Sequence, residues 1–296
     1  MKVFVTGVNG QLGNDVMNEL SRRGHDDTGS DINNGFKNIQ NYISLDITDP
    51  KTVQSVIKDI RPDAIVHCAA WTDVDRAEDP DNQKNVYKIN TEGTRNIALA
   101  AKAVDAKLIY ISTDYVFDGQ GDRPWQPDDK NYAPLNYYGR TKLDGELAVA
   151  DILEKYYIVR IAWVFGLNGK NFVSTMVNLG KTHDTIRVVS DQIGTPTYTK
   201  DLARLLVDMA ETDKYGYYHA TNEGGYISWY DFAAEIFRKM DIAANVIPVT
   251  TEEYGSSVAK RPMNSRLDKN KLGESGFTPL PDWKDALSRY LKEADL

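Results

Sequence analysis

The sequence has a single cysteine, no long apolar run and no excess of basic residues. With only Cys68 among its 296 residues, it cannot form an intramolecular disulfide. This is typical of a protein from a reducing compartment, so we expect a cytoplasmic location. No apolar stretch is long enough to span a bilayer, and the apolar start at residues 1–5 leads into Thr6-Gly7 and not into a signal-peptide cleavage site.

The charge balance excludes further classes. Asp and Glu outnumber Lys and Arg by 43 to 35, which gives a formal net charge of −8. Such a chain is not a general binder of nucleic acid or of membrane surfaces. We therefore expect neither as a partner, and an anionic small molecule would need a local group of Lys and Arg.

Alternating apolar segments indicate the fold class. Strand-like runs at residues 3–5, 63–70, 107–112 and 157–163 alternate with helical patterns at 90–104 and 137–155. The runs are almost continuously apolar, as in parallel strands buried on both faces. This predicts an α/β fold: a Rossmann-type doubly wound parallel sheet over residues 1–165, to which 185–220 return. Residues 166–184 and 221–296 would form mainly a smaller C-terminal α/β substrate domain with a final helix. The weakest strand signal is the polar segment 25–31.

A glycine-rich segment follows the first apolar run. Gly7 permits a tight turn, Gly10 allows close approach of backbone to a pyrophosphate, and Gly13 lets the next helix pack on the sheet. A helix N-terminus offers free N–H groups to phosphates. The segment therefore predicts a dinucleotide site that also includes Asn9, Gln11 and Leu12.

Later residues complete the predicted cofactor site. Asp31 lies eighteen residues after Gly13, where an acid holds the adenosine ribose. An acid there favours NADH, whereas Ser30 and Lys37 could accommodate NADPH, so both cofactors stay open. The other expected contacts are Asp46 and Ile47 beside the adenine, Ala69 and Ala70 beside the nicotinamide ribose, and Thr72.

Three residues predict redox chemistry at a carbonyl group. Tyr138 and Lys142 are four apart and share a helix face. We expect the Lys142 cation to lower the pKa of Tyr138 and so to make it an acid/base near neutrality. Lys142 could also bind the nicotinamide ribose. Thr113 ends a predicted strand and could hydrogen bond the substrate carbonyl while a nicotinamide delivers hydride.

These motifs resemble the extended short-chain dehydrogenase/reductase family. The segments at residues 67–78, 112–117, 191–197 and 261–267 further resemble its dTDP-4-dehydrorhamnose reductase branch. The resemblance implies reduction of the C4 ketone of dTDP-6-deoxy-L-lyxo-4-hexulose to dTDP-L-rhamnose by NADPH or NADH. The product would serve a cell-surface polysaccharide. It also implies a set of substrate contacts, with Arg261 near the diphosphate or the sugar: Thr113, Asp114, Tyr115, Trp163, Asn171 and Arg261.

Some alternatives stay open. Trp163 could be a core aromatic, and Arg261 a surface ion pair. Some members of the family hold Mg²⁺ at a dimer interface through glutamates, but this chain has Asp15 and Lys200 at two of those places. Because Lys is not a cation ligand, we predict no metal, doubt that dimer, and expect a monomer or a homodimer.

The same residues help to distinguish the expected reductase from proteins with related activities. A nucleotide-sugar 4,6-dehydratase would need Glu after Asp114, where this chain has Tyr115. A nucleotide-sugar epimerase that keeps its NAD bound, or a non-catalytic nucleotide-binding regulatory subunit, remains possible. The sequence leaves open the nucleotide base and the receiving polysaccharide, and stereochemistry at C4 follows from the resemblance alone.

Overall fold

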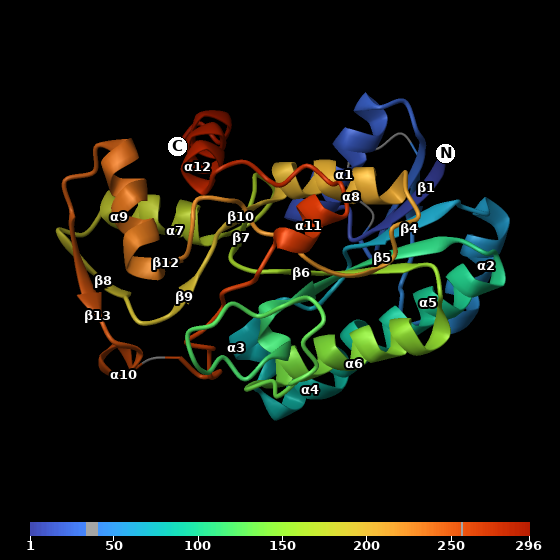
Figure 1. Ribbon diagram of the computed structural model, residues 1–296, viewed down its shortest axis with the longest axis horizontal. Helices are drawn as coiled ribbons and strands as arrows, with labels where there is room; N and C mark the ends of the chain where they lie inside the picture. Colours follow the sequence, from blue (N-terminus) through green and yellow to red (C-terminus); the bar gives the residue numbers. More distant parts are fainter. Residues whose placement is uncertain (34–40, 256) are drawn as a thin grey trace.

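A seven-stranded parallel sheet forms the centre of the molecule. The computed structural model describes residues 1–33, 41–255 and 257–296 (Figure 1). The strands follow the order β11-β6-β5-β4-β1-β2-β3, and every neighbouring pair is parallel. Their bounds are β1 (Lys2–Thr6), β2 (Asp26–Asp31), β3 (Tyr42–Ser44), β4 (Ala64–His67), β5 (Lys107–Thr113), β6 (Tyr156–Ile161) and β11 (Gly216–His219).

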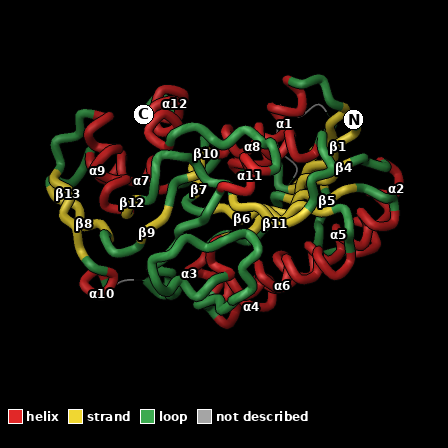
Figure 2. Tube along the Cα trace, viewed as in Figure 1, coloured by secondary structure: helices red, strands yellow, loops and turns green. Residues whose placement is uncertain are grey.

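Helices cover both faces of this sheet, which explains why its central strands are continuously apolar. One face packs against α1 (Gln11–Arg22), α8 (Thr199–Ala210) and α11 (Asn270–Glu274). The other packs against α2 (Pro50–Ile60), α5 (Thr94–Ala103) and α6 (Tyr137–Ile152) (Figure 2). Short segments α3 (Val74–Ala77), α4 (Pro80–Tyr87), the π-helix η1 (Lys88–Gly93) and the 3₁₀ turn η2 (Asp114–Val116) connect them. The predicted doubly wound Rossmann-type fold is confirmed.

The polar second strand is explained by its place in the sheet. β3 pairs only with Gly29–Asp31, so the first half of β2 has a neighbour on one side alone. Gly29 and Ser30 are the two buried residues of β2. A strand so close to the sheet edge can be polar because little of it is covered.

The remaining elements form a smaller lobe beside the sheet (Figure 1). Its strand pairs are β7 (Val164–Phe165) with β10 (Thr197–Tyr198), β9 (Ile193–Gly194) with β12 (Ile227–Ser228), and β8 (Thr185–Val189) with β13 (Asn245–Val249). Its helices are α7 (Phe172–Gly180), α9 (Trp229–Met240), α10 (Thr251–Tyr254) and α12 (Trp283–Glu293). Apolar side chains of α7, α9 and α12 share one core with those of β7, β8 and β10.

The chain returns to the sheet later than expected. β8 pairs with β13 in the smaller lobe, whereas α8 packs on α1 and β11 pairs with β6. Of the expected return segment 185–220, the part that rejoins the sheet layers therefore begins at residue 199. None of the helices in the described ranges has the length and apolarity needed to cross a membrane.

Candidate active site

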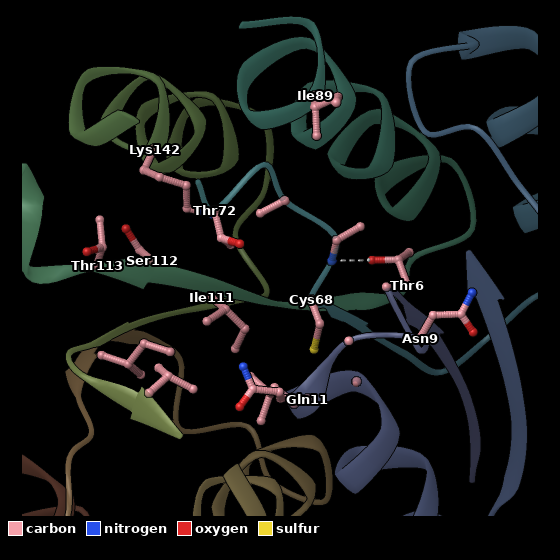
Figure 3. A pocket seen from close by; sticks show the side chains of 18 of the residues that line it. Thr6, Asn9, Gln11, Cys68, Thr72, Ile89, Ile111, Ser112, Thr113 and Lys142 are labelled. Atoms are coloured by element: carbon pink, nitrogen blue, oxygen red, sulfur yellow. Dashed lines mark hydrogen bonds between the residues drawn. The ribbon is translucent and has the colours of Figure 1, made fainter. Parts of the chain in front are cut away.

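One cavity of about 810 Å³ lies at the carboxyl ends of the central strands. This is the edge where open α/β sheets bind ligands, and the volume suits a small-molecule site. Figure 3 shows Asn9 at one end, Lys142, Ser112 and Thr113 at the other, and Gln11 between them. The cavity thus joins the glycine-rich loop to the predicted reaction centre.

The loop after β1 fits a dinucleotide. Gly7 has φ +73°, and a Cβ on it would lie 2.6 Å from the Ala69 nitrogen. A Cβ on Gly13 would lie 2.2 Å from the Gly7 carbonyl oxygen. Gly10 caps α1 without a side-chain hydrogen bond, and the first turn has no acid. The helix N-terminus is therefore free to receive an anion.

Asp31 lies at the end of β2, where the sequence places it. Its carboxylate accepts hydrogen bonds from the backbone N–H groups of Asn9 (3.0 Å) and Ile32 (2.8 Å), which fix it at the cavity wall. Ser30 also lines the cavity, but its hydroxyl donates to the Val5 carbonyl (3.2 Å). Lys37 lies outside the described residues. The other predicted cofactor residues that line the cavity are Gly7, Gly10, Gln11, Leu12, Gly13, Asp46, Ile47, Ala69, Ala70, Thr72, Tyr138 and Lys142.

The start of α6 presents Tyr138 and Lys142 to the same cavity as Thr113. The Asn136 side chain caps this helix by accepting from the Gly139 N–H (2.8 Å). Gly139 has no room for a side chain, since a Cβ would lie 2.4 Å from the Tyr115 carbonyl oxygen. This close approach of α6 to η2 brings the hydroxyl groups of Tyr138 and Thr113 to the same part of the cavity.

The electrostatics differ from the expectation for Tyr138. Removal from solvent raises the pKa of Tyr138, and the nearby Asp114 raises it further, although a hydrogen bond with Thr113 acts the other way. The expected lowering by Lys142 is wrong, because the cost of desolvating a phenolate dominates. Burial instead lowers the pKa of Lys142 to about 7, with Glu146 opposing the shift. The ammonium lies 4.2 Å from the centroid of the Tyr110 ring.

Asp114 is a deeply buried acid at this end of the cavity, with 2% of its surface exposed. Its Oδ1 accepts from the Thr113 hydroxyl (3.1 Å), while Oδ2 has no hydrogen-bond partner within the described ranges. Burial raises the pKa of Asp114 to about 7, while the neighbouring polar side chains of Ser265 and Thr113 oppose the shift. Tyr115 also lines the cavity and meets the Tyr138 ring edge to face at 6.0 Å.

Of the other three residues predicted to contact the substrate, only one lines the cavity. Trp163 lines the cavity. Asn171, expected to line it, instead caps α7, and its amide donates to the carbonyl of Gly166 (2.8 Å) and to the Tyr290 hydroxyl (3.1 Å). Arg261 is not among the cavity-lining residues.

Arg261 forms the ion pair that the sequence left as its alternative. Its guanidinium donates twice to Asp75, at 2.7 and 3.1 Å. Sequence reasoning also missed Trp229, which lines the cavity from α9. No local signal separates Trp229 from the core aromatics of the same amphipathic helix.

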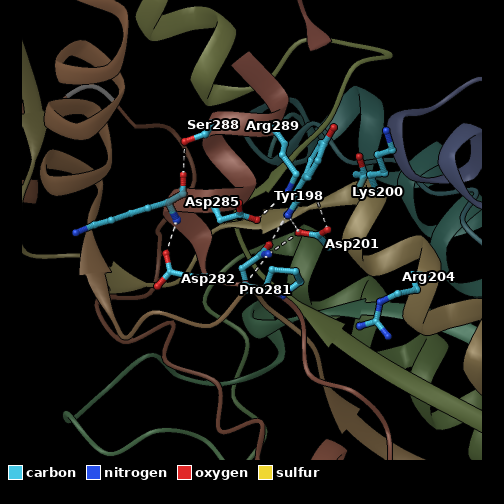
Figure 4. Close-up of polar contacts among 12 residues, drawn as sticks. Tyr198, Lys200, Asp201, Arg204, Pro281, Asp282, Asp285, Ser288 and Arg289 are labelled. Carbon is cyan, nitrogen blue, oxygen red and sulfur yellow. Dashed lines mark hydrogen bonds and ion pairs between the residues drawn. The ribbon is translucent and has the colours of Figure 1, made fainter. Parts of the chain in front are cut away.

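The side chains at the positions considered for a metal interact with other side chains of the protein. Asp15 accepts from the Thr199 hydroxyl (2.6 Å), and Lys200 pairs with Glu293 (2.8 Å). Nearby, Arg289 holds Asp201 through two hydrogen bonds of 2.8 Å (Figure 4). Within residues 1–33, 41–255 and 257–296, no three His, Cys, Asp or Glu side chains are grouped so that they could hold a metal ion.

Comparison with known proteins identifies the family. The family model described as the RmlD substrate binding domain matches residues 1–296. The chain belongs to this family. A dTDP-4-dehydrorhamnose reductase of Streptomyces griseus is 41% identical, over 96% of this chain and 91% of its own length.

Solved structures of the family agree over the whole chain. A dTDP-4-dehydrorhamnose reductase from Clostridium acetobutylicum is 42% identical, with a TM-score of 0.92 and complete coverage of both chains. One from Bacillus anthracis, in complex with NADP, is 43% identical, with a TM-score of 0.90 and 99% coverage of each chain. The similarity therefore includes both the sheet and the smaller lobe.

Proposed function

We propose that this protein reduces the C4 ketone of dTDP-6-deoxy-L-lyxo-4-hexulose to dTDP-L-rhamnose with NADPH or NADH. The observation that carries the proposal is the single cavity that contains both the glycine-rich loop and the side chains of Thr113, Tyr138 and Lys142. The relatives named dTDP-4-dehydrorhamnose reductase support the substrate.

The proposed chemistry begins at the substrate carbonyl. The Thr113 and Tyr138 hydroxyls would donate hydrogen bonds to its oxygen and so favour negative charge there. A bound nicotinamide supplies the hydride to the carbon. Because the pKa of Tyr138 is raised, the phenol keeps its proton until the oxygen becomes a strong base, and then donates it.

Lys142 has a different role in this proposal. A lysine with a pKa of about 7 exchanges protons readily at neutral pH, and its cationic form would hold the ribose hydroxyls of the cofactor. The loop residues Gly7, Gly10 and Gly13 would receive the pyrophosphate, and Asp31 the adenosine ribose.

The test is a spectrophotometric assay of the purified protein with the 4-keto sugar. NADPH and NADH are supplied in separate reactions, and the loss of reduced-nicotinamide absorbance is followed. We expect substrate-dependent oxidation that yields dTDP-L-rhamnose, and the two rates rank the cofactors. Identification of the product by NMR tests the configuration at C4.

Two other results would redirect the assignment. NAD that survives purification, with turnover that needs no added cofactor, would indicate an epimerase. A stable enzyme partner without ketone reduction would indicate a regulatory subunit. We further propose that the enzyme works in the cytoplasm and that its product serves a cell-surface polysaccharide, a role compatible with either a monomer or a homodimer.

A further inference from the structure

We propose that Trp229 is a positioning residue that holds the Trp163 indole as the aromatic wall of the sugar subsite. The inference rests on the proposed function, because it concerns the same substrate. It adds a residue of α9 to the end of the cavity where Thr113, Tyr138 and Trp163 lie.

The two indoles form a close stack at the cavity. Their ring centroids lie 3.8 Å apart with 18° between the planes, and both side chains are partly exposed and line the cavity. A core pair would be covered on all sides. A partly uncovered pair leaves a broad apolar surface for a ligand.

The backbone of Trp163 is held in an unfavourable conformation. Its φ of 51° lies in the left-handed region, which bulky residues rarely adopt. Hydrogen bonds from Thr197 fix the segment: its N–H donates to the Trp163 carbonyl (3.1 Å), and its hydroxyl to the Ala162 carbonyl (2.6 Å). Strain of this kind persists where surrounding structure enforces it and is frequent at binding sites.

The Trp163 ring lies in a slot between two neighbours. A Cβ on Gly194 would come within 2.9 Å of the ring, so glycine is required for the ring to lie there. Trp229 stacks on this ring, and no other aromatic side chain of the described residues pairs with it. The stack with Trp229 is therefore the contact that we assign to holding the indole in place.

Sheet register brings the segment that carries this indole close to the segment that carries Thr113. Thr113 is the register partner of Ile161 on the neighbouring strand, and Trp163 follows two residues later. A sugar whose carbonyl oxygen meets Thr113 would therefore place its ring near the indole. A 6-deoxy sugar has a methyl group in place of a hydroxyl, and C–H groups on an aromatic surface gain from apolar burial.

The support for Trp229 comes from the smaller lobe. It is the first residue of α9, where Ser228 and Asp231 form a capping box. Its ring also contacts Phe172, with centroids 4.5 Å apart. Because these contacts hold Trp229 in place, the position of α9 determines where the aromatic wall of the sugar subsite lies.

The experiment compares Trp229→Leu and Trp229→Phe with the control Trp283→Phe. Trp283 is 2% exposed, packs on Phe232 in the same lobe and does not line the cavity. Each variant is studied by far-ultraviolet circular dichroism, by thermal unfolding, by steady-state kinetics and by NADPH titration. Two stacked indoles give an exciton couplet in the dichroism spectrum, which reports the stack directly.

We expect Trp229→Leu to lose the couplet and to raise KM for the nucleotide sugar by about tenfold, which is about 1.4 kcal/mol. Both kcat and the Kd for NADPH should stay within about twofold, because a binding contact equal in ground and transition states affects KM alone. The ring introduced by Trp229→Phe can still stack on Trp163, so KM should stay much closer to the wild-type value than in Trp229→Leu. Trp283→Phe should keep the couplet and the sugar KM.

A sugar KM within about twofold of wild type after the couplet is lost would overturn the inference. So would an equal loss of NADPH affinity, since Trp229 would then support the whole site. If the wild-type protein reduces no keto sugar, the proposed function fails separately. The stack is then judged by indole fluorescence: stronger quenching by dTDP-L-rhamnose than by dTDP, lost in Trp229→Leu, would support it, and equal quenching would overturn it.

Discussion

Replacement of Asp114 by Asn should stabilise the protein at neutral and alkaline pH. Asp114 is 2% exposed, and one of its carboxylate oxygens has no partner within the described residues. Asn has the same shape and can still accept the hydrogen bond from Thr113, but it carries no charge that must be desolvated. The variant therefore removes the ionisation penalty and little else.

The size of the effect follows from the pKa. Burial raises the pKa of Asp114 from 3.8 to about 7. The unfolded chain loses this proton at lower pH than the folded protein, so wild-type stability falls as the pH rises from about 4 to about 7. Each pKa unit is worth about 1.4 kcal/mol. The advantage of Asp114→Asn should thus be greater by about 2–3 kcal/mol at about pH 8 than at about pH 5.

Urea unfolding of both proteins at the two pH values measures this difference. Asp49→Asn is a useful control, because the Thr52 hydrogen bond lowers the pKa of Asp49 and that side chain is ionised at both values. Its stability change should not depend on pH in this range. An Asp114→Asn advantage that is equal at both pH values would refute the account of the buried acid.

Three further substitutions test other parts of the structure. Tyr138→Phe should lower kcat by about 10²–10⁴-fold, the usual loss on removing a proton donor, while NADPH affinity stays near wild type in fluorescence titration; retained turnover would contradict the assignment. Gly13→Ala places a Cβ 2.2 Å from the Gly7 carbonyl oxygen, so we expect about 1–3 kcal/mol of destabilisation and weaker NADPH binding, and wild-type values for both would contradict the close packing of the loop. Arg160→Met leaves the fully buried Glu146 without its partner at 2.8 Å and should cost about 3–5 kcal/mol in urea unfolding; addition of Glu146→Gln should recover most of this, and a double variant no more stable than the single one would show that the pair itself is not responsible.

The features that the sequence predicted well depend on neighbouring residues along the chain. The apolar runs at β4, β5 and β6 follow from burial on both faces, and the glycine spacing after β1 follows from the geometry of one loop. The cavity then forms because parallel strands present their carboxyl ends at one edge. These local rules were sufficient to predict that Thr113, Tyr138 and Lys142 lie in one cavity.

The features that it missed depend on distant partners. Arg261 pairs with Asp75, 186 residues away in the chain, and β8 pairs with β13. The pKa of Tyr138 follows from the depth of the finished cavity, which the four-residue spacing to Lys142 does not encode. Trp229 looks like any core aromatic until Trp163 is placed against it.

The composition of the smaller lobe has a consequence for protein synthesis. Its core joins Phe165, Tyr198 and Phe232 to Trp283 and Tyr290. These last two belong to α12, so the core cannot close before α12 has left the ribosome. Until then, the nascent chain carries the earlier aromatics without the cover that Trp283 and Tyr290 supply in the finished lobe.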